Sequence, residues 1–482
     1  MEQSQQTKWS QFIPLISIFF FWGFVAASND ILIPVFKKSF TLSQLQSMLV
    51  NNAFYAAYFI GSVIFFIISM KGDILYRFGY KKTLAFGLFI SALGAFLFVP
   101  AAKLESFWVF LLALFIVGLG FSVQQIVANP LAIQMGSPET GAHRLTLAGG
   151  INSLGTTIGP ILLGLAFFGR GEKNTSLNLD EVQFPFVLLG LAFVLVAFFL
   201  LISKIEDPIK EKSTEENTIE GSQFNIFQYP QLVLGMLAIF VYVGVEVSIV
   251  SNLPALLHTE AFGNVLEENL APFISLYWGS LMIGRWNGGV NVFQLSEGKN
   301  KMLKVLVPFI AFGVIIIANS LSGKDISSFY IYPIWIVIFI LMSFLGGKNA
   351  GKTLMVFGLA GTLMMVCGLI CPDKEIAKYF FISGGLFCSI MWPAIFDLAI
   401  AGLGKNTGKA SSFLIMMILG GGIIPLIQGW ICDFDLTSPE GIFGISYTHF
   451  SYIIPVFCFV YLAFYGYISP KILKKQGVKI EA

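Results

Sequence analysis

The stretch FIPLISIFFFWGFVAASNDILIPVF, residues 12–36, decides the fold class of this chain. It is 25 residues long and almost entirely apolar, and a helix of that length crosses the hydrocarbon core of a bilayer. Its one ionisable side chain is that of Asp30. A carboxylate at membrane depth costs about 2–3 kcal/mol, so it normally faces a bundle interior or a wet cavity. Asp30 is therefore the first candidate for a functional residue.

The whole chain has the composition of a membrane protein. Of its 482 residues, 56% are hydrophobic and 12% are charged, about half the usual charged share. The net charge of +2 is too small to indicate a protein that binds nucleic acid. The N-terminal segment MEQSQQTKWSQ lacks the apolar core of a cleaved signal peptide. The five cysteines lie in or beside apolar runs and predict neither a disulfide framework nor a metal site.

Apolar runs of membrane-spanning length fall on both sides of the polar stretch IEDPIKEKSTEENTIEGSQ at 205–223. The runs lie near 12–36, 47–70, 83–102, 106–135, 143–169 and 184–205 before it, and near 229–257, 268–294, 302–321, 328–347, 352–371, 378–403, 408–432 and 448–471 after it. Six and eight runs predict an all-α polytopic protein of about fourteen helices. Basic residues gather in alternate loops, in the central stretch and in the tail KILKKQGVK. The positive-inside rule then places both termini in the cytoplasm.

A faint repeat relates the two halves of the chain. A constant offset of 265 residues matches Arg144, Gly155, Pro160 and Gly164 to Lys409, Gly420, Pro425 and Gly429. Nearer the start of each half the offset is 220, as between Pro34 and Pro254. The difference of about 45 residues is one helical hairpin. We therefore expect an N-terminal six-helix bundle at 1–205, a cytoplasmic linker at 206–228, and a C-terminal bundle at 229–482 with a hairpin inserted near 326–371; 300–347 preserves the topology equally well.

Several segments carry a family resemblance. They are SNDILIP (28–34), GDILYRFGYKK (72–82), VANP (127–130), HRLTLAGGINSLGTTIGP (143–160), FVYVGVEVSIVSNL (240–253), YWGSLMIGR (277–285), GLFCSIMWPAIFDLAIAGLG (385–404) and GKASSFLIMMILGGGIIPLIQGW (408–430). Together they resemble the major facilitator superfamily, and within it the branch of fucose:proton symporters and glucose/galactose permeases. The resemblance covers most of both halves and leaves the extra hairpin unmatched. Tyr76 stands where the superfamily signature usually has an acidic residue.

The resemblance implies a hexose:cation symporter that works by alternating access, with two pseudo-symmetric six-helix bundles and the substrate held between them. It also implies that Asp30 links cation to sugar. Gln125 stands where the fucose branch has a glutamate, which favours glucose or galactose over fucose and removes one candidate proton carrier. Asp397 occurs where a serine is commoner, and Gly149 replaces a glutamine that would face the sugar.

A sugar site needs groups that donate and accept hydrogen bonds, together with aromatic faces. The polar candidates are Asn29 and Asp30 on the first helix, Gln125 and Asn129 on the fourth and Asn152 on the fifth; Trp278 and Trp392 are the candidates for stacking on the pyranose ring. Gln125 and Asn129 are four residues apart and share a helix face. The alternative is that buried amides knit helices together and that the aromatic rings pack against lipid or core.

Two carboxylates are candidates for cation coupling. Asp30 is the first, and Glu246 lies mid-membrane in the repeat-related segment of the second half. For Glu246 the equal alternative is a buried pair with a cation such as Arg285, which would hold or gate the helices. Arg144, Lys409 and Asp397 are expected to act in gating or in bonds between helices, and Arg144 and Lys409 are alternatively positive-inside anchors.

The sequence leaves the ion open. A proton requires a carboxylate buried in an apolar helix, as Asp30 is expected to be, whereas sodium requires several oxygens, which Asp30 and Gln125 would supply. Absence of the helix-four glutamate favours sodium. No other cofactor is expected, and no metal site, because His143, His258 and His449 lack ligand spacing.

Neither a nucleophile with its base nor a metal cluster is visible in the sequence, so we do not expect an enzyme. The rival functions are a sugar uniporter, a fucose permease and a non-transporting sugar sensor. The expected partners are a small-molecule sugar and the lipid bilayer of a bacterial inner membrane, with the protein functional as a monomer.

Overall fold

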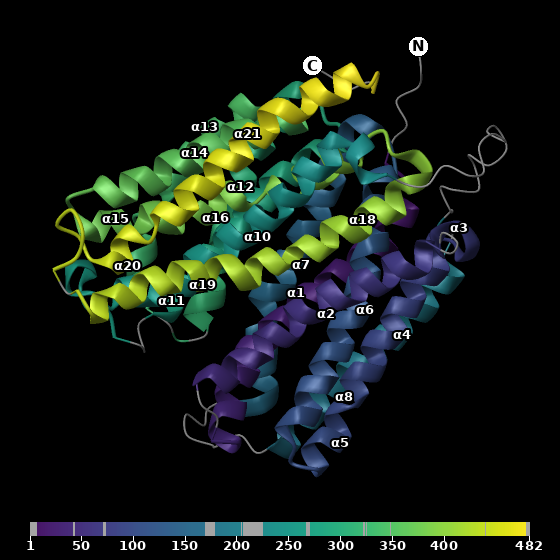
Figure 1. Cartoon of the computed structure of the whole chain (residues 1–482), viewed down its shortest axis with the longest axis horizontal. Coiled ribbons are helices and arrows are strands. Elements are labelled where there is room, and N and C mark those ends of the chain that lie inside the picture. The colour runs from purple at the N-terminus through teal and green to yellow at the C-terminus, as the bar shows by residue number, and fades with distance from the viewer. Residues whose placement is uncertain are drawn as a thin grey trace. The chain divides into compact units, whose positions relative to one another are not determined.

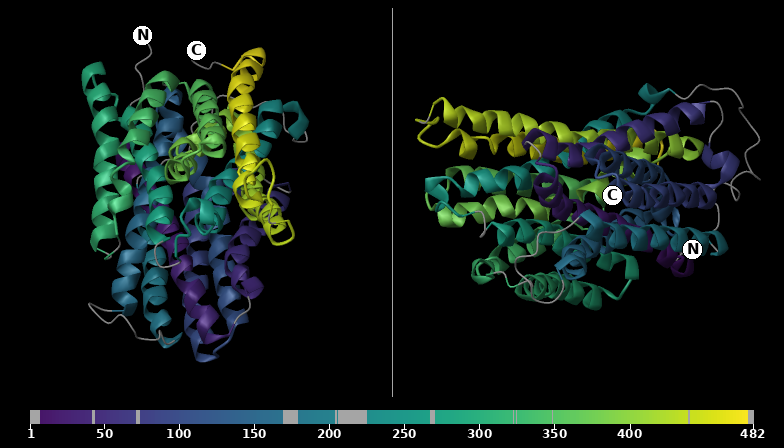
Figure 2. Two further views of the ribbon diagram at one scale, coloured as in Figure 1. Left: turned by 90° about the vertical axis from the view of Figure 1, so that its left-hand side faces the viewer. Right: turned by 90° about the horizontal axis from the view of Figure 1, so that it is seen from below.

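The structure is a computed structural model that describes residues 7–41, 44–70, 74–168, 179–203, 205, 225–266, 270–321, 323, 325–347, 349–438 and 440–478. Within these ranges, side chains are described except at 27–35, 37–38, 44–48, 51, 76, 160–168 and 179–182. Most of the predicted linker, residues 206–224, lies outside the described residues. The described chain is built of helices (Figures 1 and 2), with one isolated bridge between Ile442 and Ile445.

The chain forms two compact units. Unit 1 comprises Met1–Pro138, Leu154–Asn225 and Leu403–Met416, and unit 2 comprises Glu139–Ser153, Ile226–Gly402 and Met417–Ala482. Helix α7 (Gly141–Phe168) contributes its first half to unit 2 and its second half to unit 1.

Unit 1 contains the first helices of the chain. They are α1 (Trp9–Ser39), α2 (Gln44–Met70), α3 (Ile74–Phe78), α4 (Tyr80–Phe96), α5 (Phe98–Lys103), α6 (Phe107–Gln134) and α8 (Leu179–Ile202), with α18 (Thr407–Met416) from the second half. Helix α4 packs along α6 and α8, and α18 packs against α2 and α6.

Unit 2 contains the remaining α-helices. They are α10 (Pro230–Leu257), α11 (Ala271–Gly289), α12 (Glu297–Leu321), α13 (Pro333–Gly346), α14 (Ala350–Ile370), α15 (Lys374–Ile382), α16 (Gly384–Cys388), α17 (Met391–Ile400), α19 (Gly420–Cys432), α20 (Tyr447–Phe450) and α21 (Ile453–Lys475). Figure 1 shows α14 alongside α21, and α10 packs against α17, α19 and α21.

Twelve helical segments among the described residues are long and apolar enough to cross a membrane. Helices α7 and α11, with 28 and 19 residues, are also of spanning length, although α11 carries Arg285 and Asn287. These fourteen segments coincide with the fourteen apolar runs of the sequence, which confirms the predicted all-α polytopic fold.

Glycines allow the closest helix contacts. A Cβ atom at Gly94 of α4 would lie 2.6 Å from the backbone nitrogen of Val117 on α6, and one at Gly358 of α14 would lie 2.6 Å from the backbone nitrogen of Ala463 on α21. Small residues drive such packing in membranes, because the solvent there is itself apolar.

The packing of α14 repeats that of α4. Helix α4 lies along α6 and α8, and α14 lies along the α15–α17 segment and α21. The two helices before α14 are peripheral, because α12 packs mainly along α11, and α13 along α14. Two side-chain bonds tie them to α11: Ser280 Oγ to Tyr332 Oη at 2.6 Å, and Asn319 Nδ2 to Ser275 Oγ at 2.8 Å.

Candidate functional site

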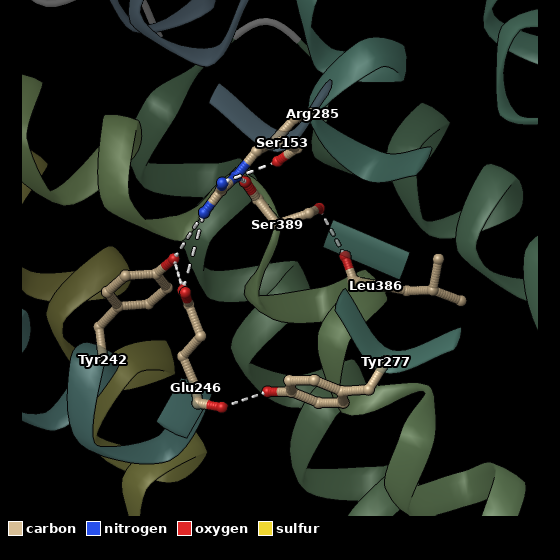
Figure 3. A network of polar contacts seen from close by, with 7 residues as sticks. All are labelled: Ser153, Tyr242, Glu246, Tyr277, Arg285, Leu386 and Ser389. Atoms are coloured by element: carbon tan, nitrogen blue, oxygen red, sulfur yellow. Dashed lines mark hydrogen bonds and ion pairs between the residues drawn. The ribbon is translucent and has the colours of Figure 1, made fainter. Parts of the chain in front are cut away.

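A buried polar network in unit 2 surrounds Arg285 (Figure 3). Its guanidinium Nη2 lies 3.8 Å from Glu246 Oε2, and the two side chains are only 14% and 15% exposed. The hydroxyl of Tyr242, one helical turn before Glu246 on α10, donates to the same carboxylate oxygen. The structure therefore brings Glu246 and Arg285 together as a buried ion pair, the arrangement that the sequence offered as the alternative to coupling.

The other nitrogens of Arg285 reach two further elements. Nη1 donates to Ser153 Oγ of α7 at 2.9 Å, and Nε donates to the backbone oxygen of Ser389 at 3.3 Å. Ser389 lies between α16 and α17, where the helix is interrupted. Such interruptions expose backbone carbonyls, and within a membrane those carbonyls need a partner. Arg285 supplies one, and it thereby connects α7, α10, α11 and the α16–α17 break.

Aromatic side chains border this network. The ring of Trp392 lies 6.1 Å from that of Tyr242, and the ring of Trp278 packs edge-on against Tyr277 at 5.7 Å. Tyr277 Oη donates to the backbone oxygen of Glu246 at 2.6 Å. Both tryptophans, the predicted stacking residues, are half-buried and lie beside residues that contact Glu246.

The middle of α7 lies against α11. Asn152 is half-buried and directly precedes Ser153, the residue that binds Arg285. One turn earlier, a Cβ atom at Gly149 would lie 3.4 Å from Cδ of Arg285. The side chain of Arg285 therefore lies beside Gly149, the position at which the family resemblance predicts a glutamine.

In unit 1 the side-chain amides of α6 differ in their hydrogen-bond partners. Gln125 Nε2 donates to Tyr58 Oη of α2 at 2.8 Å, and Gln125 is half-buried. Asn129, four residues later, is 1% exposed, and its Nδ2 has no hydrogen-bond partner. A buried amide of this kind is unusual, and it marks the Gln125–Asn129 face as one suited to a polar ligand.

Gln124 is a polar residue that the sequence reasoning missed. It is fully buried, its Oε1 accepts from Trp22 Nε1 at 2.9 Å, and its Nε2 donates to Ser91 Oγ at 2.8 Å. All these partners are protein groups, so Gln124 joins α1, α4 and α6 structurally. Tyr58 was also missed as a partner of Gln125, although its place about three turns into an apolar run was a usable signal.

The predicted gating charges fall in both units. Arg144, at the start of α7, is fully buried and donates from Nη1 to Thr140 Oγ1 at 2.6 Å. Asp397 of α17 lies in the same unit. Lys409 is half-buried at the start of α18 in unit 1.

The side chains of Asn29 and Asp30 lie outside the described residues, although the backbone there is part of α1. In the part of the chain that the structure describes, no group of three or more His, Cys, Asp and Glu side chains is arranged to hold a metal ion.

Residues 15–370 match the sequence profile of the Major Facilitator Superfamily. The chain is 34% identical over 458 residues to a glucose/galactose transporter of Brucella abortus, covering 95% of this chain and 93% of the relative. It is 26% identical to the L-fucose-proton symporter of Escherichia coli, covering 88% of this chain and 86% of that relative. A crystal structure of a fucose:proton symporter in its outward conformation matches with a TM-score of 0.70 at 24% identity, over 95% of this chain and 98% of that chain, which is a likeness of fold.

Proposed function

Because this chain belongs to the major facilitator superfamily, we propose that it is a cation-coupled symporter that takes up a hexose of the glucose/galactose type by alternating access. The observation that supports this most is the 34% identity to a glucose/galactose transporter over 95% of the chain. The polar residues of the two units supply the chemistry that a sugar needs, namely amides that donate and accept alongside aromatic faces.

We propose that the amides bind the sugar hydroxyls. The buried, unpartnered Nδ2 of Asn129 supports a donor role, and the half-buried Gln125 and Asn152 lie on elements that carry other polar contacts. Trp392 and Trp278 are proposed to pack against the apolar face of the ring. Asn29 and Asp30 complete the set on the evidence of the sequence.

We assign cation coupling to Asp30 and a structural role to Glu246. A coupling carboxylate must take up and release its cation in each cycle, whereas Glu246 already has a guanidinium and a phenol hydroxyl as partners. Arg144 with Asp397, and Lys409, are proposed to act in gating. The relatives named fucose-proton symporters favour a proton as the coupling ion, and a sodium site near Asp30 and Gln125 is the alternative.

Fucose is the second candidate substrate, on the same relatives. Gln125 argues against it, since the fucose branch carries a glutamate there. Competition of labelled D-glucose uptake by D-galactose, L-fucose and D-mannitol separates the two candidates.

We propose that the inserted hairpin is α12–α13, which corresponds to 300–347, rather than 326–371. The support is that α14 packs against its neighbours as α4 does, which makes α14 the counterpart of the third helix. We also propose an inner-membrane location, cytoplasmic termini and a functional monomer.

The test is uptake of labelled D-glucose into proteoliposomes, with either a sodium gradient at matched pH or a proton gradient without sodium. We expect one gradient to drive accumulation above equilibrium. Asp30→Asn is expected to abolish that accumulation and to retain exchange of labelled for unlabelled sugar. If glucose only equilibrates across the membrane with either gradient, the protein is a uniporter. If it binds glucose without transporting it, the protein is a sensor.

A further inference from the structure

The loop that follows α19, residues 433–446, carries two highly exposed apolar side chains. Leu436 is 85% exposed and Phe443 is 87% exposed. These are the highest values among the large apolar side chains that the structure describes. Exposing such side chains to water is unfavourable, so the loop presents a surface that is suited to an apolar environment.

The loop continues an apolar stripe of α19. This helix belongs to a segment, Gly404–Leu436, that is long and apolar enough to cross a membrane. Its exposed large apolar side chains recur at helical spacing and share one face, namely Ile423, Leu426, Ile427 and Trp430. Phe434, in the turn directly after α19, extends the same row and is also exposed. On a spanning helix of a multi-pass membrane protein, the solvent of such a stripe is lipid.

The tip of the loop is a two-residue turn with Phe443 at its first central position. The backbone nitrogen of Ile442 donates to the backbone oxygen of Ile445 at 2.8 Å, and the nitrogen of Ile445 donates to the oxygen of Ile442 at 3.0 Å. The two central residues, Phe443 and Gly444, have φ angles of 53° and 78°. Such turns favour Asn-Gly, because most side chains are strained in the left-handed region. The chain therefore keeps a strained phenylalanine at a position where its ring is exposed.

Contacts within the loop fix its shape. The two carboxylate oxygens of Asp435 accept from the backbone nitrogens of Tyr447 and Thr448, at 2.6 and 2.8 Å. The ring of Phe434 packs against those of Trp430 and Tyr447, with centroid distances of 5.1 and 5.6 Å. The loop thus presents its two exposed apolar side chains from a framework of internal bonds.

We propose that this loop anchors the protein at the surface of the bilayer, with Leu436 and Phe443 inserted at the boundary between phospholipid headgroups and acyl chains. Continuity with the stripe of α19 supports lipid as the occupant, and a tryptophan at the end of a spanning helix, such as Trp430, is typical of this depth. Helix α21 runs from this loop to the C-terminal tail, so the proposed cytoplasmic termini place the anchor in the outer leaflet.

A protein partner suits the loop less well than lipid. A stable protein interface uses about 20–30 residues on each side, more than this loop contains, and its core is depleted of charged residues. Here Glu440 lies between Leu436 and Phe443 in the sequence and is exposed as they are. The bilayer surface accommodates this mixture, because charged headgroups and acyl chains lie next to each other there.

The test uses the purified full-length chain in vesicles of palmitoyl-oleoyl phosphatidylcholine. The photo-crosslinking residue benzoylphenylalanine replaces Phe443, Leu436 or Glu440 in turn, and mass spectrometry of the irradiated protein measures the lipid adduct. Phe457, an exposed residue of α21, is the control for a lipid-facing position. We expect about fivefold more lipid adduct at Phe443 and Leu436 than at Glu440, since apolar side chains enter the interface and charged ones stay in water. Equal adducts at the three loop positions overturn the proposal, as does a crosslinked second copy as the main product at Phe443.

Two variants separate the ring from the turn that carries it. Phe443→Asn is expected to fold with an unchanged or raised melting temperature in detergent, because asparagine tolerates a positive φ. With benzoylphenylalanine at Leu436, Phe443→Asn is expected to lower the lipid adduct about fivefold, since the anchor loses one of its two apolar side chains. Phe443→Trp keeps an interfacial ring and is expected to retain the adduct. An adduct at Leu436 that Phe443→Asn leaves unaltered overturns the anchoring role of the ring.

Discussion

Removing either partner of the Glu246–Arg285 pair is expected to destabilise the protein more than removing both. Glu246→Gln leaves the guanidinium uncompensated, and Arg285→Met leaves the carboxylate with only the hydroxyl of Tyr242. With the charges 3.8 Å apart and an effective dielectric constant of about 20, their attraction is about 4 kcal/mol. Breaking one side of a buried pair typically costs about 3–5 kcal/mol, since the other charge stays buried.

The double variant Glu246→Gln/Arg285→Met carries no unpaired charge. We therefore expect it to be more stable than either single variant, with a coupling free energy of about 2 kcal/mol or more in the double-mutant cycle. The assay is equilibrium unfolding in detergent, followed by tryptophan fluorescence and circular dichroism, with agreement of the two probes as the check on two-state behaviour.

The matched control is the pair of Lys301 with Glu297, whose Nζ–Oε1 distance is 2.5 Å and whose side chains are 63% and 82% exposed. Solvent screens this pair, so its coupling is expected to stay below about 1 kcal/mol in the same cycle. Additive effects of Glu246→Gln and Arg285→Met, within about 0.5 kcal/mol, would refute the claim that their attraction is realised in the folded protein.

Three further predictions concern single side chains. Gly420→Ala is expected to lower the melting temperature and the yield of folded protein, because a Cβ atom at this position would lie 1.9 Å from a carbonyl oxygen of α10. The control is Gly313→Ala, where a Cβ atom would have nothing within 4 Å, so the melting temperature and the yield should be unchanged or raised. Gln125→Glu is expected to make uptake titrate between about pH 5 and 8, since it buries a carboxylate beside Tyr58 Oη; a flat pH profile would contradict this. Gly149→Gln is expected to change the KM for hexose with little change in kcat, because its side chain would extend past the guanidinium into the region proposed for sugar; a pure loss of kcat would argue against that position.

The number and position of the helices could be predicted because lipid leaves the backbone no alternative. Each apolar run must satisfy its own N–H and C=O groups, so a run of spanning length becomes a helix. The run at 378–403 shows the limit of this rule. It divides into α15, α16 and α17, with the interruption at Ser389 where Arg285 binds the free carbonyl. Hydropathy cannot show such a break, because the residues around it are as apolar as the helix.

The hydrogen-bond partners of the candidate site residues were harder to predict than which residue types would form the site. Gln124 and Gln125 are adjacent and chemically identical, but successive residues of a helix are turned about 100° apart. Gln124 therefore meets Trp22 within the bundle and Gln125 meets Tyr58. Which of the two faces which neighbour depends on the rotation of α6 about its axis, and tertiary packing sets that rotation.

The contacts of Glu246 support the proposed assignment of cation coupling to Asp30 rather than to Glu246. A carboxylate that exchanges a proton or sodium needs a vacant coordination position, and its counter-charge must change during the cycle. Glu246 has the opposite character, since Tyr242 and Arg285 both hold the same oxygen and Arg285 is itself anchored by Ser153. Neutralising Glu246 would leave the buried guanidinium of Arg285 without its counter-charge and would disturb the contacts among α7, α10, α11 and the α16–α17 break. Exchange at such a position is costly, and this cost is the physical reason for assigning coupling to the carboxylate of α1 and cohesion of unit 2 to that of α10.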